Sequence, residues 1–549
     1  MTNRTHPCGR PRPFYWRMAD RLVTLLQQLP PAECGYTIAR NLRIPARDGI
    51  DLLADVYTPT GLIKGTLLLR SPYGWRMLMG VLTGGVYASR GYRVILARCR
   101  GTFGSGGTFE PMQHEVEDAA DTVAWMREQP WFDGSFATFG GSYLGFTQWA
   151  LLMDPPPELR AAVISIAPHD FHESVYGGGA FNLADFLGWS HQMAHQEDTF
   201  WRRMWGLVTA RRHALSAMQE LPLADAGEKL LAGRAPWYRD WISRRDPDDP
   251  FWSAMRLGEA LDRVQVPVLL QVGWQDIFLE RTIEQYDRLK ERGVNVALTI
   301  GPWTHVELVT RGGSIAVGET LDWLGEHLAG NGLHTRAKPV KIFVTGAQQW
   351  RDLPHWPPST REHCLYPTAG GGLADSPADT DAQAVFTYDP TNPTPTIGGR
   401  VLVGGGYTDD SALASRGDVL CFTGQVLSSP VEIFGSPVLE LVHVTDNPHA
   451  DLFARLSEVT PDGRSRNVSE GFLRLAPDAA SGTLRLELDA VAHRFKAGNR
   501  IRLVLSGGSH PRWERNLGSG EDPATSRTAV PSRRTIKLPA SRLLLAVGD

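Results

Sequence analysis

A single serine follows two glycines where an apolar run changes from a strand pattern to a helix pattern. The stretch is FATFGGSYLGFTQWALL, residues 136–152, and the serine is Ser142. A serine on such a sharp strand-to-helix turn has its Oγ held clear of the sheet, where it can act as a nucleophile. The strict G-x-S-x-G form is broken by Leu144, so this stretch alone also fits a packing turn in any α/β protein.

A nucleophilic serine needs a base, and the base needs a carboxylate that orients it. Asp276 follows the apolar run VPVLLQVG, and His305 follows the run VNVALTIG 29 residues later. Both residues stand at the carboxyl end of a predicted parallel strand, where open α/β sheets place their ligand sites. The chain order Ser, Asp, His is that of the α/β-hydrolases, so the three residues together predict a catalytic triad.

The elements that must position these residues alternate along the first part of the chain. A hairpin is predicted at 36–59, and GTLLLRSPYG and YRVILARCRG are typical of buried parallel strands. EVEDAADTVAWMREQP, between the second run and the serine strand, has a helical pattern, and alternation resumes after residue 262, with a last helix expected to start near Gly318. This order predicts an α/β fold with a parallel sheet and helices on both faces.

Two segments depart from the alternation. Residues 175–261 are rich in Trp, His, Met and Arg at helical spacings, which predicts an inserted helical cap. After residue 336, short strands alternate with Gly and Pro turn signals, which predicts an all-β sandwich or jelly roll. We therefore expect an N-terminal helical extension (1–35), an α/β-hydrolase domain (36–174 and 262–335), a helical cap (175–261) and a C-terminal jelly-roll domain (336–549).

The composition excludes several other classes of protein. A net charge of −4 provides no electrostatic basis for binding nucleic acid or an anionic membrane. The five cysteines are scattered and form no C-x-x-C pair, which argues against a disulfide framework or a zinc site and fits a reducing cytoplasm (Cys8, Cys34, Cys99, Cys364 and Cys421). Because no signal-peptide pattern and no apolar run of about 18 residues occurs, we expect a cytoplasmic protein without a membrane span.

Four motifs together resemble a known family. They are RSPYG around Tyr73, GGSYLG around Ser142, GWQD around Asp276 and GPWTH around His305. This set is similar to that of the cocaine-esterase-like serine hydrolases, which are relatives of the X-prolyl dipeptidyl peptidases and the α-amino-acid ester hydrolases. The resemblance runs from about residue 36 to the C-terminus. It implies an α/β-hydrolase domain, a helical cap and a C-terminal jelly roll.

The resemblance also implies a role for each motif residue. Ser142 would be the nucleophile, His305 the base and Asp276 its orienter, with an oxyanion hole formed by the Tyr73 hydroxyl and the backbone N–H of Tyr143. The position of Tyr143 supports its role independently, because an N–H at a helix start favours a developing oxyanion. Tyr73 follows a predicted strand, where the second donor of such folds commonly lies, although an ordinary surface aromatic residue also fits this position.

Two features depart from the family pattern. Family members usually carry Asp in a D-x-R-G loop, whereas this chain has Arg98-Cys99-Arg100-Gly101, so the ion pairing of the loop must differ. The first 35 residues have no counterpart in the family pattern. The helix predicted at 14–29 is expected to cover part of the sheet or to form an oligomer contact. A homo-oligomer is therefore one of the expected assemblies.

Other candidate sites are weaker, and no cofactor or metal is expected. The glycines at 101, 104, 106 and 107 follow a strand, but their spacing is not G-x-G-x-x-G and no Gly-Lys-Ser/Thr follows, which argues against a nucleotide site. His191 and His195 lie four residues apart on a predicted cap helix, but no H-E-x-x-H is present. We therefore interpret both histidines as solvent-facing or pocket residues.

The substrate class follows from the residues after Asp276. The α-amino-acid ester hydrolases carry an acidic pair in a D-x-E-D pattern, because a buried substrate ammonium needs a carboxylate partner. Here the chain reads Asp276-Ile277-Phe278-Leu279, and Glu280 lies one position past the pattern. Phe278, together with Trp189 in the cap, resembles the aromatic residues of the acyl pocket in the esterase branch.

The predicted function is therefore a carboxylesterase that cleaves small uncharged acyl esters through an acyl-enzyme. The alternative within the family is an X-Pro dipeptidyl peptidase or an α-amino-acid ester hydrolase. The alternative outside enzymes is a binding protein on a hydrolase scaffold, and an intact set of triad and oxyanion residues argues against it.

Overall fold

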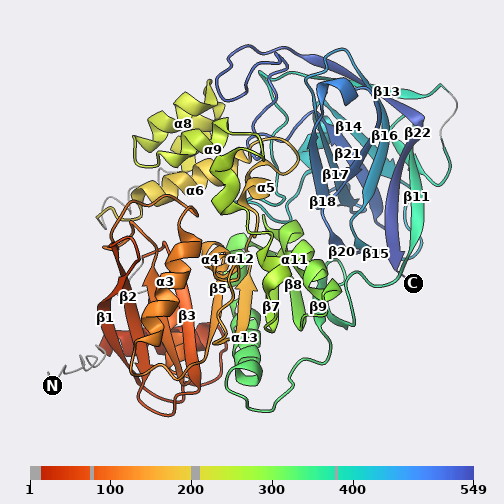
Figure 1. Cartoon of the computed structure of the whole chain (residues 1–549). Coiled ribbons are helices and arrows are strands. Elements are labelled where there is room, and N and C mark those ends of the chain that lie inside the picture. The colour runs from red at the N-terminus through yellow and green to blue at the C-terminus, as the bar shows by residue number, and fades with distance from the viewer. Residues whose placement is uncertain (1–13, 75–79, 200–210, 378–380, 549) are drawn as a thin grey trace, which may run out of the picture.

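The computed structural model describes residues 14–74, 80–199, 211–377 and 381–548. Three groups of elements meet near the middle of the molecule (Figure 1). A sheet with flanking helices occupies the lower half of the view, a cluster of helices lies at the upper left, and strands form the upper right. The predicted α/β-hydrolase core with an inserted helical cap and a C-terminal all-β domain is confirmed.

The described residues form a ten-stranded sheet in the order β1-β2-β4-β3-β5-β6-β7-β8-β9-β10. Every neighbouring pair from β4 to β9 in this order is parallel, while β1, β2 and β10 pair antiparallel. The carboxyl ends of the parallel strands therefore meet at one edge. The strands are β1 (Tyr36–Pro45), β2 (Asp51–Pro59), β3 (Gly65–Ser71), β4 (Tyr92–Arg98), β5 (Phe136–Gly141), β6 (Leu159–Ser165), β7 (Val268–Gln275), β8 (Val296–Thr304), β9 (Val340–Val344) and β10 (Gln349–Leu353).

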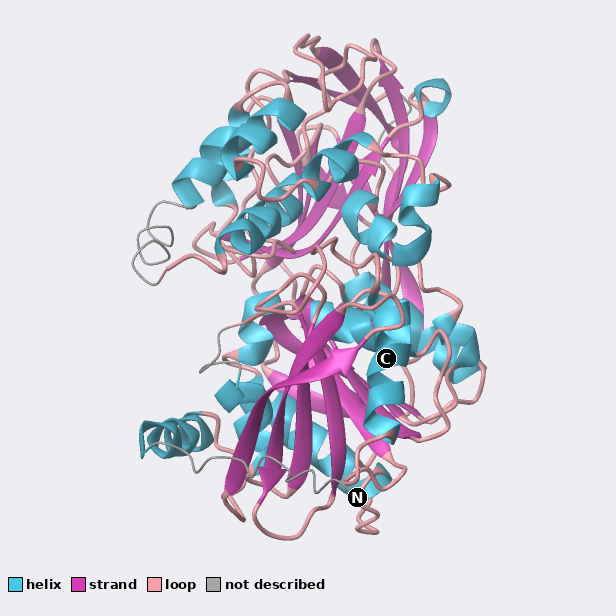
Figure 2. Cartoon of the chain, turned by 60° about the vertical axis from the view of Figure 1, so that its left-hand side comes forward, coloured by secondary structure: helices cyan, strands magenta, loops and turns pink. Residues whose placement is uncertain are grey.

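Helices cover both faces of this sheet (Figure 2). Side chains of α3, α4, α11 and α12 pack in the core of one face, and those of α2 and α13 pack in the core of the other. Successive strand residues such as Leu67 and Leu68 enter opposite cores, because side chains alternate along a strand. The helical elements are α1 (Phe14–Leu26), η1 (Gly80–Gly85), α2 (Val86–Ala88), α3 (Glu115–Arg127), α4 (Tyr143–Leu151), α11 (Leu279–Glu291), α12 (His305–Val309) and α13 (Gly313–His327).

The last helix of this domain begins earlier than predicted. We expected it near Gly318, whereas α13 begins at Gly313. The stretch RGGSIAVG carries three glycines, which lower helix propensity and hide the start in the sequence. A Cβ at Gly318 would meet nothing within 4 Å, so this glycine is an ordinary interior position of the helix.

The cap lies between β6 and β7, which pair directly with each other. Its described elements contain no strand over 175–199 and 211–261. Aromatic side chains hold it together, such as Phe171, whose ring centroid lies 5.1 Å from that of Phe186 and 4.9 Å from that of Trp241. The elements are α5 (Phe171–Tyr176), α6 (Leu183–His195), α8 (Leu223–Leu231), α9 (Trp237–Ser243), η2 (Pro250–Met255) and α10 (Ala260–Arg263).

The all-β domain consists of strands that surround a separate apolar core with residues such as Leu439, Leu456 and Leu503. β11 joins its two halves, since it pairs with β12 on one side and with β22 on the other. The elements are β11 (Thr360–Thr368), β12 (Gly372–Ala374), β13 (Gln383–Tyr388), η3 (Ser411–Ser415), β14 (Val419–Gly424), β15 (Val431–Gly435), β16 (Val438–Thr445), β17 (Asp451–Val459), β18 (Ser465–Arg474), η4 (Pro477–Ala479), β19 (Gly482–Glu487), β20 (Val491–Phe495), β21 (Arg500–Ser506) and β22 (Ser532–Gly548).

Two strands expected in the all-β domain belong to the first sheet instead. β9 pairs parallel with β8, and β10 pairs with β9, so the first sheet extends past residue 336 to Leu353. The sequence misleads here because VKIFV alternates between buried and half-buried residues, as strands of antiparallel sheets do. The all-β strands therefore begin later than the predicted residue 336, with β11.

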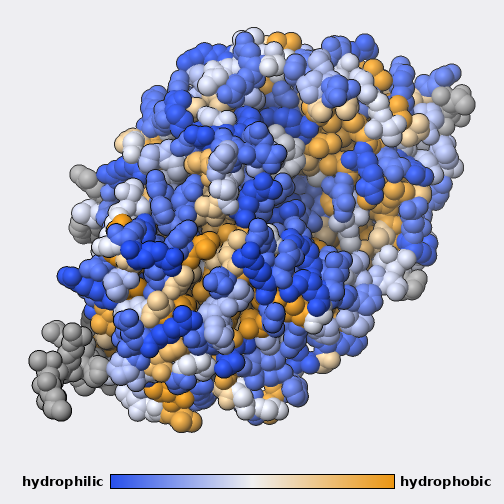
Figure 3. Space-filling view, viewed as in Figure 1, coloured by the Kyte–Doolittle hydropathy of each residue, from blue (hydrophilic) through white to orange (hydrophobic). Residues whose placement is uncertain are grey.

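The N-terminal helix α1 packs against the sheet domain through Ala19 and Val23. Its outer side exposes apolar side chains by more than half of their surface (Met18, Leu22, Leu25 and Leu26). On the face seen in Figure 3, hydrophilic residues predominate, and hydrophobic residues gather over the all-β domain and in patches over the sheet domain. No helix of the described residues is long and apolar enough to cross a membrane.

Candidate active site

Ser142 stands between β5 and α4 with a backbone conformation that few side chains adopt. Its φ is 59° and its ψ is −127°. Two backbone bonds hold this conformation, because the Ser142 N–H donates to the carbonyl oxygens of Ser165 (3.0 Å) and Ile166 (3.1 Å) at the end of β6. Such strain costs about 1–3 kcal/mol and persists only where the surroundings hold it, as in a nucleophile elbow.

Two glycines explain how the turn forms although Leu144 breaks the strict motif. Gly140 has a φ of +146°, and a Cβ there would lie 2.7 Å from the Leu144 Cβ. A Cβ at Gly145 would lie 2.2 Å from the Ala167 Cβ. The close approach of α4 to the chain after β6 therefore requires a glycine at position 145, three residues after the serine.

Asp276 and His305 follow the neighbouring strands β7 and β8 and contact each other. His305 Nδ1 lies 2.9 Å from Asp276 Oδ2, and both side chains are buried. The second carboxylate oxygen of Asp276 accepts the Phe278 N–H at 2.8 Å, which fixes the carboxylate plane. With its Nδ1–H donating to Asp276, His305 keeps Nε2 as an acceptor, which is the tautomer that a general base needs.

Tyr73 lies just after β3, and its phenol faces the Ser142 side chain. The Ser71 hydroxyl holds the turn, since it accepts the Tyr73 N–H at 3.1 Å. Gly74 is required beside it, because a Cβ there would lie 2.2 Å from the Phe103 ring. Burial raises the pKa of Tyr73 above its usual value, so the phenol is protonated at neutral pH and can donate.

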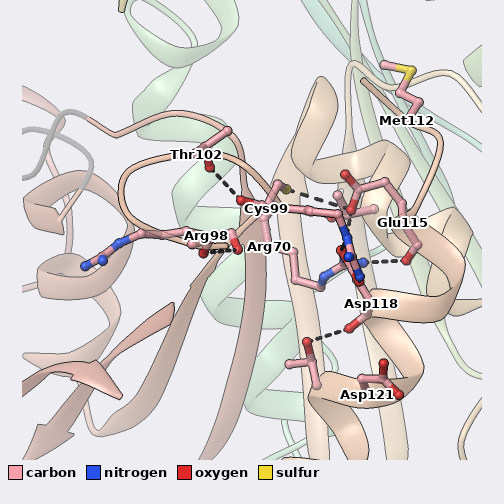
Figure 4. Close-up of polar contacts among 12 residues, drawn as sticks. Arg70, Arg98, Cys99, Thr102, Met112, Glu115, Asp118 and Asp121 are labelled. Carbon is pink, nitrogen blue, oxygen red and sulfur yellow. Dashed lines mark hydrogen bonds and ion pairs between the residues drawn. The ribbon is translucent and has the colours of Figure 1, made fainter. Parts of the chain in front are cut away.

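Tyr143, the residue after Ser142, is anchored by a buried network that Figure 4 shows in part. Its hydroxyl donates to Glu115 Oε1 at 2.8 Å and accepts the Met112 N–H at 2.8 Å. The other oxygen of Glu115 accepts from Arg70 on β3 at 2.6 Å. Glu115 therefore links α4, which begins with the Tyr143 N–H, to β3, which leads to Tyr73. An N–H in the first turn of a helix has no partner within the helix.

The arginines of the unusual loop have partners of their own. Arg98 donates to Asp55 on β2 at 2.7 Å and to Asn41 at 2.9 Å. Arg100 donates to Asp118 at 2.6 Å and to Asp48 at 2.6 Å. Arg98 thus stands where family members usually carry an acidic residue, and it forms an ion pair with Asp55 on the neighbouring strand. Both arginines of the loop therefore have acidic partners.

The two residues predicted for the acyl pocket contact different residues of the site. The Phe278 ring packs edge-on against His305, with ring centroids 5.5 Å apart. Trp189 on α6 stacks on the Tyr143 ring, with centroids 6.2 Å apart, and its Nε1 donates to the Tyr73 hydroxyl at 3.1 Å. The sequence contains no signal for this last bond, because 116 residues separate its two partners.

A cavity of about 220 Å³ lies where cap, sheet domain and all-β domain meet. Ile277, next to Asp276, is part of its wall together with acidic and basic side chains (Glu173, Asp185, Glu280, Arg281, Arg400, Glu470, Glu487, Asp489 and Arg512). Arg400 and Arg512 pair with Asp489 and Glu470, whereas Asp185 and Glu280 have no ion pair among the described residues.

Asp185 and Glu280 instead accept backbone N–H groups. Asp185 accepts from Leu402 at 2.8 Å, and Glu280 accepts from Ala490 at 2.9 Å. Burial raises the pKa of Asp185 to about 6 and also raises that of Glu280. Glu280 therefore points toward the all-β domain, beyond the position of the D-x-E-D acids.

His191 and His195 lie side by side on α6, with ring centroids 4.7 Å apart. His195 bonds to Asp198 at 2.9 Å, and burial lowers the pKa of His191 to about 4. The described residues contain no group of three or more His, Cys, Asp or Glu arranged to hold a metal ion. Within the described ranges, no further ligand of the kind that a metal site needs joins this pair.

The sequence matches two family descriptions. Residues 48–307 match the X-Pro dipeptidyl-peptidase (S15) family, and residues 331–540 match the X-Pro dipeptidyl-peptidase C-terminal non-catalytic domain. The chain is 29% identical to the cocaine esterase of Rhodococcus sp. (strain MB1 Bresler), over 88% of this chain and 93% of that protein. Over most of its length, the chain is therefore similar to the cocaine-esterase-like serine hydrolases.

Solved structures share the fold of this cocaine-esterase-like hydrolase over nearly its whole length. An α-amino acid ester hydrolase has a TM-score of 0.80 at 20% identity, covering 95% of this chain and 98% of its own. An aminopeptidase from a marine sediment Thaumarchaeota archaeon has a TM-score of 0.78 at 20% identity, with the same coverage. At this identity the likeness concerns the fold alone, so the substrate has to be argued from the side chains.

Proposed function

We propose that this protein is a carboxylesterase that cleaves small uncharged acyl esters through an acyl-enzyme. The observation that carries the proposal is the apolar sequence Ile277-Phe278-Leu279 directly after Asp276, with the Phe278 ring against His305. An aromatic wall beside the base suits an uncharged acyl group, because burying a substrate ammonium there would need a carboxylate partner.

In the proposed mechanism, Ser142 attacks the ester carbonyl while His305 Nε2 takes its proton, and Asp276 stabilises the imidazolium that forms. The Tyr73 hydroxyl and the Tyr143 N–H donate to the oxyanion. His305 then returns the proton to the leaving alcohol, and the same groups assist water in hydrolysing the acyl-enzyme. Charge–charge repulsion is avoided at the oxyanion because Tyr73 is held in its protonated form.

A second candidate substrate class is favoured by the charged cavity. Asp185 and Glu280 are acidic residues without an ion pair among the described residues, and the cavity wall reaches Ile277 beside the triad. A substrate ammonium placed in this cavity could form an ion pair with one of these carboxylates. This observation supports amino-acid esters or X-Pro peptides as substrates, which are the substrate classes of the related aminoester and peptidase branches.

The two classes are separated by comparing kcat/KM for three substrates. We expect a short-chain p-nitrophenyl ester to be turned over at least about tenfold better than an amino-acid ester or an X-Pro p-nitroanilide, because an unpaired buried charge is costly. Glu280→Gln is the matched variant, and it should leave the rate with the neutral ester unchanged. A preference for either amine-bearing substrate that Glu280→Gln abolishes would move the assignment to the second class.

Tyr73→Phe should lower kcat by about 10² to 10³ with little change in KM, because the variant keeps the ring and removes one oxyanion donor. Steady-state kinetics with the preferred ester measure this directly. Tyr87→Phe is a control, since it removes a buried phenol of the same domain that lies on α2, in the core on the sheet face that α13 covers. A Tyr73→Phe enzyme with wild-type kcat would exclude the phenol from the oxyanion hole.

A further inference from the structure

The indole N–H of Trp189 is hydrogen-bonded to the Tyr73 hydroxyl, the proposed oxyanion donor. Trp189 Nε1 donates to the Tyr73 hydroxyl at 3.1 Å, and the same phenol faces the Ser142 side chain. Trp189 belongs to the cap helix α6, whereas Tyr73 follows β3 of the sheet domain. The cap therefore contributes a side chain that contacts the phenol beside Ser142.

The chemistry of the two groups sets the direction of this bond. An indole N–H can only donate, whereas a phenol has a single proton to donate and can also accept. The Tyr73 oxygen must therefore accept the Trp189 proton, and its own proton remains for the other side, where Ser142 lies. A donor on the phenol oxygen also lowers the pKa of Tyr73, opposing the effect of burial, and so strengthens the O–H as a hydrogen-bond donor.

The same helix is tied to the Tyr73 turn at its other end. Gln196, which caps α6, donates from Nε2 to the Pro72 carbonyl oxygen at 3.1 Å. Glu197 accepts the Phe103 N–H at 3.0 Å, and the Phe103 ring fills the space beside Gly74. Contacts from α6 thus hold both the phenol and the backbone of the turn that carries it.

We propose that Trp189 is a positioning residue of the oxyanion hole, which directs the Tyr73 hydroxyl at the substrate oxyanion so that the hole is complete only when α6 of the cap is in place. This proposal rests on the proposed acyl-transfer function. It assigns to the indole N–H a role distinct from the acyl-pocket contact expected for the Trp189 ring.

The test is a double-mutant cycle with Trp189→Phe and Tyr73→Phe. Trp189→Phe keeps an aromatic ring and removes the N–H, and we expect kcat to fall roughly threefold to tenfold with KM nearly unchanged. The affinity for phenylboronic acid, which forms a tetrahedral adduct on a reactive serine, should fall by a similar factor. In the Tyr73→Phe background, Trp189→Phe should cause no further loss, because the phenol through which it acts is gone.

Trp237→Phe is the matched control. Trp237 packs beside Trp189, with ring centroids 6.3 Å apart, but its Nε1 donates to Ser190 Oγ instead. It should change kcat by less than a factor of about two. If Trp189→Phe does not fold, Gln196→Leu tests the other tether, and its loss of kcat should also vanish in the Tyr73→Phe background.

The inference is overturned if Trp189→Phe lowers kcat equally in both backgrounds, changes KM alone, or has no effect. A ring that merely lines the acyl pocket would produce the first or second result. The cycle can be run on any acyl substrate that the wild-type enzyme turns over. A preference for amine-bearing substrates would therefore contradict the proposed substrate class without deciding the role of Trp189.

Discussion

Ser142→Ala should reduce ester turnover by roughly 10⁶-fold, because no other group can form the acyl-enzyme once the Oγ is removed. The backbone of the turn should persist, since the Ser142 N–H bonds to Ser165 and Ile166 involve no side-chain atom of residue 142. The variant should therefore fold and bind substrate while failing to react. Turnover of a p-nitrophenyl ester and labelling by a fluorophosphonate probe measure the two consequences.

Ser165→Ala is the matched control for this experiment. Ser165 is a nearby buried serine whose hydroxyl donates to Gln271 at 2.8 Å, so it should keep both turnover and labelling. Substantial ester turnover by Ser142→Ala would show that the nucleophile is wrongly assigned. Absence of labelling in the wild-type protein would favour a non-catalytic binding protein on a hydrolase scaffold.

Asp276→Asn should lower kcat by about 10⁴ while leaving KM nearly intact. The Phe278 N–H donates to Asp276 Oδ1 and would hold the amide oxygen of the new side chain in that place. The amide NH₂ would then face His305 Nδ1, which would have to accept, so the proton would move to Nε2. A histidine protonated at Nε2 cannot take the proton of Ser142.

Steady-state kinetics at a fixed pH check this expectation, with thermal unfolding to verify that the variant is folded. Asp262→Asn is a control, because Asp262 is an exposed carboxylate that pairs with Arg288 away from the triad. A loss of kcat smaller than about tenfold in Asp276→Asn would mean that the tautomer of His305 is not set by this carboxylate.

Much of the architecture could be predicted because each signal is local. Apolar runs at β3, β4, β5, β7 and β8, each followed by a turn or a helix, are enough to predict a parallel sheet. In such a sheet the carboxyl ends meet at one edge, so Asp276 and His305 could be expected to meet from their positions alone. Their 2.9 Å contact follows from two neighbouring parallel strands, in which Gln275 pairs with Thr304 and the residue that follows each strand is Asp276 or His305.

Other boundaries could not be predicted, because the local pattern is ambiguous. β9 alternates like a strand of the all-β domain, and only its pairing with β8 places it in the first sheet. The glycines at the start of α13 and inside it lower helix propensity, and the packing of the helix on the sheet outweighs that cost. In both cases long-range contacts supply more free energy than the local preference.

The sequence by itself places four site residues after predicted strands (Tyr73, Ser142, Asp276 and His305). Their proximity could be predicted because the carboxyl ends of parallel strands meet at one edge of a sheet. Three features could not be predicted from the sequence. They are the hydrogen bond from Trp189 to Tyr73, the hydrogen bond of Tyr143 to Glu115, and the charged cavity beside Ile277. They join side chains from different elements, and their contacts depend on how the cap and the all-β domain pack against the sheet. Packing of this kind is set by the fit of whole surfaces, which no short stretch of sequence encodes.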